Sequence, residues 1–329
     1  MVDFGYTLMT EQAGPTELVR HAAVAEQAGF DFEVLSDHYF PWLDEQGHSP
    51  HAWGVLGAVA QVTERVELMT YVTCPTMRYH PAVVAQLATT IQLLSGNRFT
   101  LGVGAGENLN EHVIGRGWPP VNVRHDMLAE ALQIIAGLFD GGYFNYAGMH
   151  FRVDSAKLWD LPEVRVPVAV AVSGSQSVQR FAPLADAMVA VEPKESLCAE
   201  WDRIFTETHD AKSAKIGQLP VCWDRSHADA VHRAHEQFRW FGGTWKVNAE
   251  LPGPPAFAAA AQYVTPDDVA ESIPCGPDVD RIVSAAQPFW EAGFTHLALV
   301  QIGGDHQEEF LEMAPRELIP ALREAASGR

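Results

Sequence analysis

The chain has 329 residues, of which 47% are hydrophobic and 19% charged, and this composition excludes a disordered protein. Its formal net charge of −20 at pH 7 disfavours nucleic acid and anionic membranes as partners. The N-terminus lacks signal-peptide features, no apolar run reaches membrane-spanning length, and the four cysteines form no CxxC motif. We therefore expect a cytoplasmic protein with reduced thiols.

Short apolar runs alternate with helical patterns along the chain. Apolar residues at three- and four-residue spacing predict helices, for example over residues 18–25 and 84–94. Pro81 and Gly96 fit the start and the end of the second of these helices. Eight apolar runs are predicted as strands: Phe4–Leu8, Phe32–Leu35, Val66–Val72, Phe99–Val103, Val168–Val172, Ala187–Val191, Leu219–Trp223 and His296–Val300.

An internal repeat supports a barrel. Residues 25–30 (AEQAGF) and 289–294 (FWEAGF) each place a glycine and an aromatic residue between a helix and a strand. Eight strand–helix units in this length predict an α/β fold of the (β/α)8 TIM-barrel type. A doubly wound sheet is the alternative, but no strand leads into a GxGxxG motif.

Two segments interrupt the rhythm of strands and helices. Residues 141–167 contain aromatic residues among glycines and predict a hairpin insertion, and residues 241–275 are rich in Pro, Gly and Ala. The second segment is expected to form a lid or an insertion on the substrate side. No linker separates two halves, so residues 1–329 are predicted to be a single barrel domain with these insertions.

The loop after the second predicted strand carries Asp37, His38 and Trp42. Parallel strands of a barrel present their following loops at one face, where barrel enzymes carry their chemistry. Histidine can exchange a hydroxyl proton near neutral pH, and the indole can form a flat wall beside a ring. Two other interpretations stay open. One is a metal site, although no HxH or HExxH spacing is present. The other is that Asp37 and His38 only satisfy each other.

Glu107 stands among glycines directly after the fourth predicted strand, in the sequence Gly104-Ala105-Gly106-Glu107. Glycine permits the backbone to approach a flat or phosphorylated ligand closely. The carboxyl group is suited to exchanging a proton with a ring nitrogen or to accepting a hydrogen bond from a substrate. The alternative is that Glu107 is an ordinary N-cap for the next helix.

Two further strand ends bear polar residues. Ser173, Gly174, Gln176 and Ser177 follow the fifth strand and open a helix, which suits a phosphate cradle. Cys74 follows the third strand, and because no base is adjacent to it, packing is favoured over a nucleophilic role.

Several motifs occur together along almost the whole chain: Phe4-Gly5-Tyr6, Ser36-Asp37-His38…Pro41-Trp42, Cys74-Pro75-Thr76, Gly102-Val103-Gly104…Gly106-Glu107…Leu109-Asn110-Glu111, Cys275-Gly276-Pro277-Asp278 and Ala292-Gly293-Phe294. With these motifs the chain resembles the deazaflavin-dependent branch of the luciferase-like superfamily. Within that branch it is similar to the group named after glucose-6-phosphate dehydrogenases that use coenzyme F420.

The resemblance implies a (β/α)8 barrel, usually dimeric, that binds coenzyme F420 and a small-molecule substrate. It implies that the catalytic residues are His38, Trp42 and Glu107, and that no metal takes part. It also implies a cis peptide at Tyr71–Val72. The residues implied to bind the cofactor are Asp37, Tyr71, Val72, Cys74, Gly106, Asn110, Ser173, Gly174, Gln176 and Ser177.

The resemblance also bears on the substrate. Relatives that act on glucose 6-phosphate hold the phosphate with several cations, but only Lys194 stands at a comparable place here, and residues 257–261 read FAAAA. We therefore expect hydride transfer between F420 and an alcohol or carbonyl compound, possibly a sugar phosphate but not glucose 6-phosphate itself. The alternatives are an FMN-dependent luciferase-like monooxygenase and a ligand-binding barrel without turnover.

Overall fold

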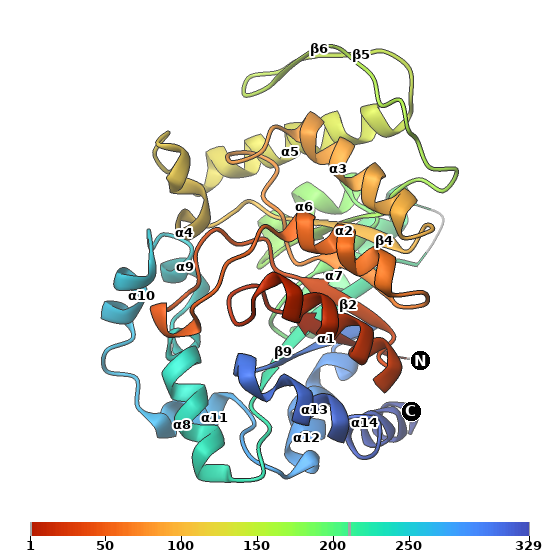
Figure 1. The fold of residues 1–329 in the computed structure, drawn as a ribbon. Coiled ribbons are helices and arrows are strands. Elements are labelled where there is room, and N and C mark those ends of the chain that lie inside the picture. The colour runs from red at the N-terminus through yellow and green to blue at the C-terminus, as the bar shows by residue number, and fades with distance from the viewer. Residues whose placement is uncertain (1, 210–211, 329) are drawn as a thin grey trace.

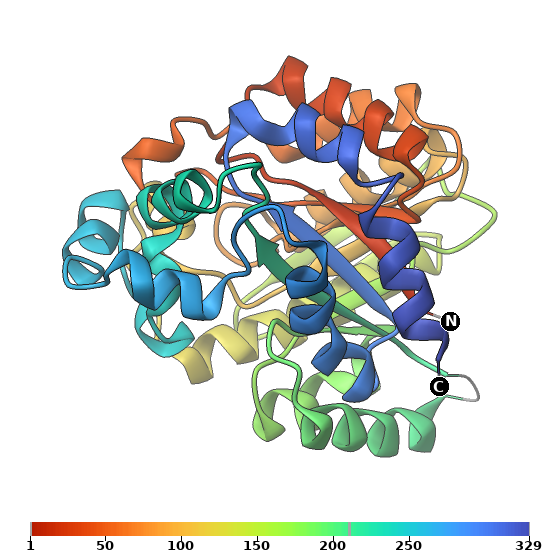
Figure 2. The same cartoon turned by 90° about the horizontal axis from the view of Figure 1, so that it is seen from below.

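The computed structural model describes residues 2–209 and 212–328. Eight parallel strands form a closed barrel in the order β1-β10-β9-β8-β7-β4-β3-β2, with helices around it (Figures 1 and 2). The predicted (β/α)8 barrel is therefore confirmed. The barrel strands are β1 (Asp3–Leu8), β2 (Phe32–Leu35), β3 (Glu67–Thr70), β4 (Phe99–Val103), β7 (Val168–Ala171), β8 (Ala187–Val189), β9 (Ala214–Val221) and β10 (His296–Gln301).

The helices begin and end where the local chemistry predicts. Pro81 is the first residue of its helix, where a missing N–H costs nothing, and Gly29 ends the first helix with φ 95°. Gly293 repeats this geometry with φ 103° before β10. The helices around the barrel are α1 (Pro15–Ala28), α2 (Ala52–Val62), α3 (Pro81–Leu94), α5 (Val121–Phe139), α6 (Ser175–Phe181), α7 (Glu195–Thr208), α12 (Val279–Glu291), α13 (Gln307–Met313) and α14 (Leu318–Ser327).

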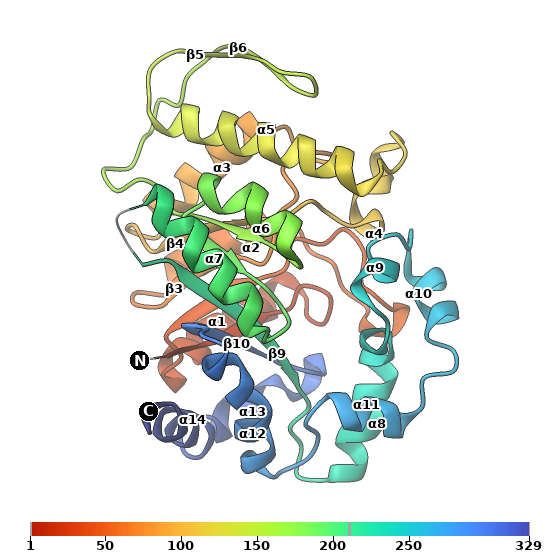
Figure 3. The ribbon, with the colours of Figure 1, turned by 180° about the vertical axis from the view of Figure 1, so that it is seen from behind.

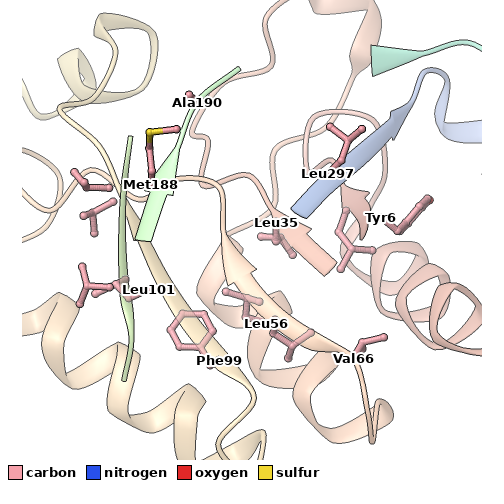
Figure 4. Close-up of a cluster of buried hydrophobic side chains, with 14 of the residues drawn as sticks. Tyr6, Leu35, Leu56, Val66, Phe99, Leu101, Met188, Ala190 and Leu297 are labelled. Atoms are coloured by element: carbon pink, nitrogen blue, oxygen red, sulfur yellow. The ribbon is translucent and has the colours of Figure 1, made fainter. Parts of the chain in front are cut away.

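The core has two layers because side chains alternate along each strand. In β2, Phe32 and Val34 belong to a cluster made only of strand and strand-end residues, which fills the barrel. Leu35 of the same strand belongs to the larger cluster between strands and helices, part of which is drawn in Figure 4. Alanines at 169, 187 and 298 lie in the inner cluster, since the barrel interior leaves little room.

Most strand boundaries that differ from the prediction do so by one or two residues, but the start of β9 differs by five. The strand β9 begins at Ala214, five positions before the predicted Leu219, because Lys215, Gly217 and Gln218 interrupt the apolar run without ending the strand. Gly217 is required there, since a Cβ atom would lie 2.6 Å from the Phe289 ring. The strand β3 ends at Thr70, before the predicted Val72.

Both segments that interrupt the alternation of barrel strands and helices form substructures of their own. The first contains an antiparallel hairpin of β5 (Phe144–Ala147) and β6 (Arg152–Ala156), as predicted, and it projects beyond α5 in Figure 1. No helix among the described residues is long and apolar enough to cross a membrane.

The second interruption is a helical cap, which we define as residues 223–274, between β9 and the helix α12 that completes its barrel unit. It contains α8 (His227–Phe238), α9 (Trp245–Asn248), α10 (Pro254–Ala260) and α11 (Pro266–Ser272). These helices lie together on one side of the barrel (Figure 3). The predicted range 241–275 misses the first part of the cap. The apolar residues of α8 have the four-residue spacing of an ordinary barrel helix, so the sequence does not mark α8 as part of an insertion.

Candidate active site

An acid, an imidazole and a second acid lie in a row at the carboxyl ends of β1, β2 and β4. His38 Nδ1 lies 3.0 Å from Glu11 Oε1, and His38 Nε2 lies 4.0 Å from Glu107 Oε2. The three side chains are only 9%, 1% and 16% exposed, in the order His38, Glu11, Glu107. The imidazole is therefore placed between two carboxyl groups in a site largely shielded from water.

Glu11 is held rigidly and was not identified from the sequence. The hydroxyl groups of Ser36 and Thr10 donate to Glu11 Oε2 at 2.6 and 3.2 Å. This leaves Oε1 directed at His38 and fixes the imidazole with Nδ1 bound to Glu11 and Nε2 free for another partner. The sequence does contain a signal, because Glu11 follows the first strand as Asp37 and Glu107 follow the second and fourth.

The charges in this row shift the ionisation of its members. Burial alone would lower the pKa of His38, but Glu11 and Glu107 raise it to about 9. Burial raises the pKa of Glu107 to about 7, against the opposing effect of His38. Near neutral pH, His38 is thus protonated and Glu107 is divided between its two forms, an arrangement that suits proton transfer.

Trp42 forms an aromatic wall beside His38. The two ring centroids are 4.9 Å apart, and Trp42 stacks on Trp240 at 4.0 Å with an interplanar angle of 9°. Phe257 packs nearly perpendicular to Trp42, with ring centroids 5.1 Å apart, and Gln46 Oε1 accepts the backbone N–H of Trp42 at 2.8 Å. Trp240 and Phe257 come from the cap, so two distant segments build this wall. The sequence offered no periodic signal for that contact.

Asp37 has partners other than His38, so the interpretation that the two satisfy each other is wrong. Thr73 Oγ1 donates to Asp37 Oδ2 at 2.8 Å, and Tyr79 and Arg78 reach Oδ1 at 3.3 and 3.4 Å. The carboxylate is 1% exposed and anchors the loop that carries His38.

Glu107 stands at the N-cap position of α4 (Asn108–Glu111), but its side chain accepts no capping hydrogen bond from the described residues. The preceding Gly106 has φ 80°, and a Cβ there would lie 2.6 Å from Cys74 Sγ. Cys74 is therefore buried under the Glu107 loop. Its thiol lies 3.1 Å from the Thr76 hydroxyl.

Asn110 joins the two loops that carry the catalytic candidates. Its Oδ1 accepts the backbone N–H groups of Tyr39 and Phe40 at 2.8 and 3.3 Å. The side chain of Asn110 is buried. This residue therefore fixes the His38 loop relative to the Glu107 loop.

The Tyr71–Val72 peptide after β3 is cis, which confirms the expectation drawn from the resemblance. The Tyr71 hydroxyl and Glu107 Oε2 are both buried and have no hydrogen-bond partner within residues 2–209 and 212–328. Buried polar atoms of this kind are usually satisfied by something, such as water or a ligand.

Ser173, Gly174, Gln176 and Ser177 lie at the start of α6, on the same barrel face as His38. Ser177 Oγ accepts the N–H groups of Ser173 and Gly174, both at 3.2 Å, while Ser173 and Gln176 are exposed. Lys194 follows β8, is exposed, and forms an ion pair with Glu192. None of the contacts within the described part of the chain joins these residues to His38.

The cap is also attached to the Glu107 loop. Asn108 donates through its backbone N–H to Ala249 O at 3.0 Å and through Nδ2 to Glu250 O at 2.9 Å. Arg124 adds an ion pair to the Glu250 carboxylate at 3.0 Å. The cap thus contacts the site at two places, Trp42 on one side and Asn108 on the other.

Comparison with known proteins gives a consistent result. The sequence model of the family described as luciferase-like monooxygenase matches residues 2–296. The chain is 34% identical to an F420-dependent glucose-6-phosphate dehydrogenase of Beutenbergia cavernae, with 98% of both chains covered. It is 32% identical to the enzyme of that name from Amycolatopsis mediterranei, over 98% of this chain and 99% of that one.

Solved structures agree with these relatives. An F420-dependent secondary alcohol dehydrogenase, in complex with an F420–acetone adduct, superposes with a TM-score of 0.88. The two sequences are 27% identical, with 98% of this chain and 99% of that one covered. A coenzyme F420-dependent tetrahydromethanopterin reductase from Methanopyrus kandleri has a TM-score of 0.78 at 20% identity, over 98% of this chain and 99% of that one, which shows the same fold.

Proposed function

This chain belongs to the luciferase-like monooxygenase family, and on that basis we propose that it is an oxidoreductase that transfers a hydride between coenzyme F420 and an alcohol or carbonyl substrate. The observation that carries the proposal is the placement of His38 between Glu11 and Glu107, with Trp42 beside it. Hydride transfer to or from a C–O carbon needs a group that exchanges the oxygen's proton, and this row supplies one.

The residues fit the cofactor. The orphaned Glu107 Oε2 and Tyr71 hydroxyl offer polar partners for a heteroaromatic ring. When bound, F420 supplies a deazaflavin carbon that accepts or gives the hydride. The residues that would hold it are Tyr71, Val72, Cys74, Gly106 and Asn110 around the ring, Ser173, Gly174, Gln176 and Ser177 toward its tail, and Asp37, which holds the His38 loop.

The proton steps follow from the geometry at His38. In carbonyl reduction the protonated imidazole donates from Nε2 to the carbonyl oxygen, while Glu11 stabilises its charge at Nδ1. In alcohol oxidation the neutral imidazole accepts the hydroxyl proton at Nε2. Since the pKa of His38 is about 9, its proton-donating form dominates at pH 7, which suits reduction. Glu107, whose Oε2 lies 4.0 Å from His38 Nε2, is the second group in the row that can exchange a proton.

The substrate is an alcohol or carbonyl compound and not glucose 6-phosphate itself. Lys194, the predicted substrate-binding cation, is paired with Glu192. Arg78 is occupied by Asp37 and Glu111, and Arg124 by Glu250. A phosphate group would have to compete with these carboxylates, whereas a neutral hydroxyl or carbonyl group needs only His38.

We also propose that the chain acts as a homodimer in the cytoplasm and that residues 1–329 form one domain. The proposal of a dimer rests on the resemblance to F420-dependent enzymes, and the location rests on the four free thiols. Sedimentation velocity over a range of protein concentrations tests the dimer: a single species at the monomer mass would refute it.

Titration with F420, followed by the absorbance of the deazaflavin, tests the proposed function. We expect saturable binding and, with a suitable ketone, a reaction that falls by about 10²–10⁴ in His38→Ala while the cofactor still binds. The matched control is Glu308→Gln, an exposed carboxylate distant in sequence from the row. Binding of FMN but not F420, with oxygen consumption, would identify a monooxygenase instead.

A further inference from the structure

Two of the four cysteines face each other across adjacent chain segments. Cys222 follows β9 and Cys275 follows the helical cap, and the two residues form an isolated parallel β-bridge. The N–H of Cys222 donates to Pro274 O and the N–H of Gly276 donates to Cys222 O, both at 3.0 Å. This register places Cys275 directly opposite Cys222, with both side chains on the same side of the pair.

The spacing of this pair permits a disulfide bond. Paired β-segments run about 4.7–4.9 Å apart, and disulfides join residues whose Cα atoms are roughly 4.4–6.8 Å apart. Both thiols are buried, with exposed fractions of 0% for Cys222 and 2% for Cys275. The Cys222 thiol also points to Ile302 O, but the Sγ–O distance of 3.9 Å is too long for a hydrogen bond that would hold the thiol away from its neighbour.

The environment distinguishes these thiols from the other two. A hydrogen bond from the Cys222 thiol, helped by Arg281 and Arg233, lowers the pKa of Cys275. Burial raises the pKa of Cys198 to about 11, and burial also raises that of Cys74. Because the thiolate is the reactive form, Cys275 is the nucleophile of the pair and Cys222 its partner.

We propose that Cys222 and Cys275 are a redox modification site that forms a reversible disulfide in the folded protein. With a peroxide as oxidant, the Cys275 thiolate attacks an oxygen of the peroxide, the O–O bond breaks, and a sulfenic acid forms. The Cys222 sulfur then displaces hydroxide from it, which leaves as water after gaining the Cys222 proton. In total, two thiols lose two electrons and two protons, and one hydrogen peroxide becomes two waters.

A disulfide between Cys222 and Cys275 would covalently join the two ends of the helical cap. Residues 223–274 lie between the two cysteines and supply Trp240 and Phe257 to the wall around Trp42, and Ala249 to the contact with Asn108. A covalent link at the base of this segment limits its opening while leaving those contacts in place. Oxidation therefore couples the redox state of the surroundings to the mobility of the cap.

The test oxidises the full-length native protein with hydrogen peroxide, blocks remaining thiols, and maps the peptides by mass spectrometry. We expect one peptide pair joined through Cys222 and Cys275, lighter by two hydrogens and released by dithiothreitol, while Cys74 and Cys198 are still alkylated. Cys198→Ser should behave like the wild type. Cys222→Ser and Cys275→Ser should each lose the joined pair.

Other outcomes would overturn the proposal: four alkylated thiols after oxidation, sulfinic acid at Cys275 without a joined peptide, or a link that forms only in denaturant. Limited proteolysis tests the effect on the cap. Cleavage within residues 241–265 should be slower in the oxidised than in the reduced protein, and equal rates would refute the link between oxidation and cap mobility. The wild-type peptide map decides the main question even if a serine variant fails to fold.

Discussion

At the scale of single residues, the site depends on how three charges are arranged. Glu11 is the most buried carboxyl of the row, and the charge of His38, with hydrogen bonds to His38 and from Ser36, lowers its pKa despite burial. A permanently ionised acid beside Nδ1 keeps His38 protonated, and Glu107, with a pKa of about 7, has the flexibility to change its protonation state. Each acid thus has a different role because its surroundings differ.

Replacing Glu11 by Gln should lower the pH at which ketone reduction is lost. Reduction needs protonated His38, so in the wild type the rate falls as pH rises through about 9. Without the Glu11 charge this limb should move down by about 1–3 units. The pH profile of kcat/KM measures the shift, with Glu308→Gln as the control. An unmoved alkaline limb would show that Glu11 does not govern His38.

At the scale of the elements, the strand β2 carries a destabilising group. Glu33 is 1% exposed, and both carboxyl oxygens are without a partner in the described part of the chain. Burial raises its pKa well above the ordinary value, so the folded protein holds this proton more tightly than the unfolded chain. Glu33 therefore destabilises the folded protein least below the unfolded pKa of about 4.3, where it is protonated in both states. The destabilisation grows as pH rises above that value, because only the unfolded chain then gives up the proton readily.

Replacing Glu33 by Met, which has a similar length and no polar atoms, should therefore stabilise the protein. We expect a gain of about 1–3 kcal/mol at pH 8, shrinking toward pH 4. Thermal unfolding at both pH values measures it, and Glu67→Gln, at the exposed start of β3, serves as the control. A stability gain that is equal at pH 4 and pH 8 would contradict the ionisation argument.

The cap is a second element whose contribution can be measured. Trp240 stacks on Trp42, so Trp240→Ala removes one of the two aromatic contacts between the cap and Trp42 in the His38 loop. The expected result is a higher KM for the substrate and faster proteolysis of the cap, with a kcat that changes less. Trp245→Ala is the matched control, because Trp245 lies in the same cap but is 43% exposed. Equal effects of both variants would show that loss of any indole suffices.

At the scale of the whole molecule, the net charge of −20 acts on every charged ligand. The field of so many carboxylates repels anions at a distance, and salt screens it. We expect kcat/KM for a phosphorylated substrate to rise as salt increases from about 10 to about 150 mM, over which the Debye length falls from about 30 to about 8 Å. For a neutral alcohol it should stay constant. A decrease for the phosphorylated substrate would reveal a local cationic site.

Much of the fold is encoded locally. The eight apolar runs, Pro81 at a helix start and Gly29 and Gly293 at helix ends were recognisable because strand, cap and turn preferences act over a few residues. The start of β9 differs from the prediction because a strand inside a barrel tolerates Gly217 and Lys215 when its neighbours on both sides supply the hydrogen bonds.

Residue patterns alone predict the barrel, the strand ends at which His38, Trp42 and Glu107 stand, and the resemblance to F420-dependent enzymes. The folded chain was needed to show that Glu11 is the partner of His38, that Asp37 holds its own loop, and that Trp240 covers Trp42. The reason is physical: which strand ends meet depends on closure of the whole barrel, and contacts between residues 42 and 240 leave no periodic trace along the chain.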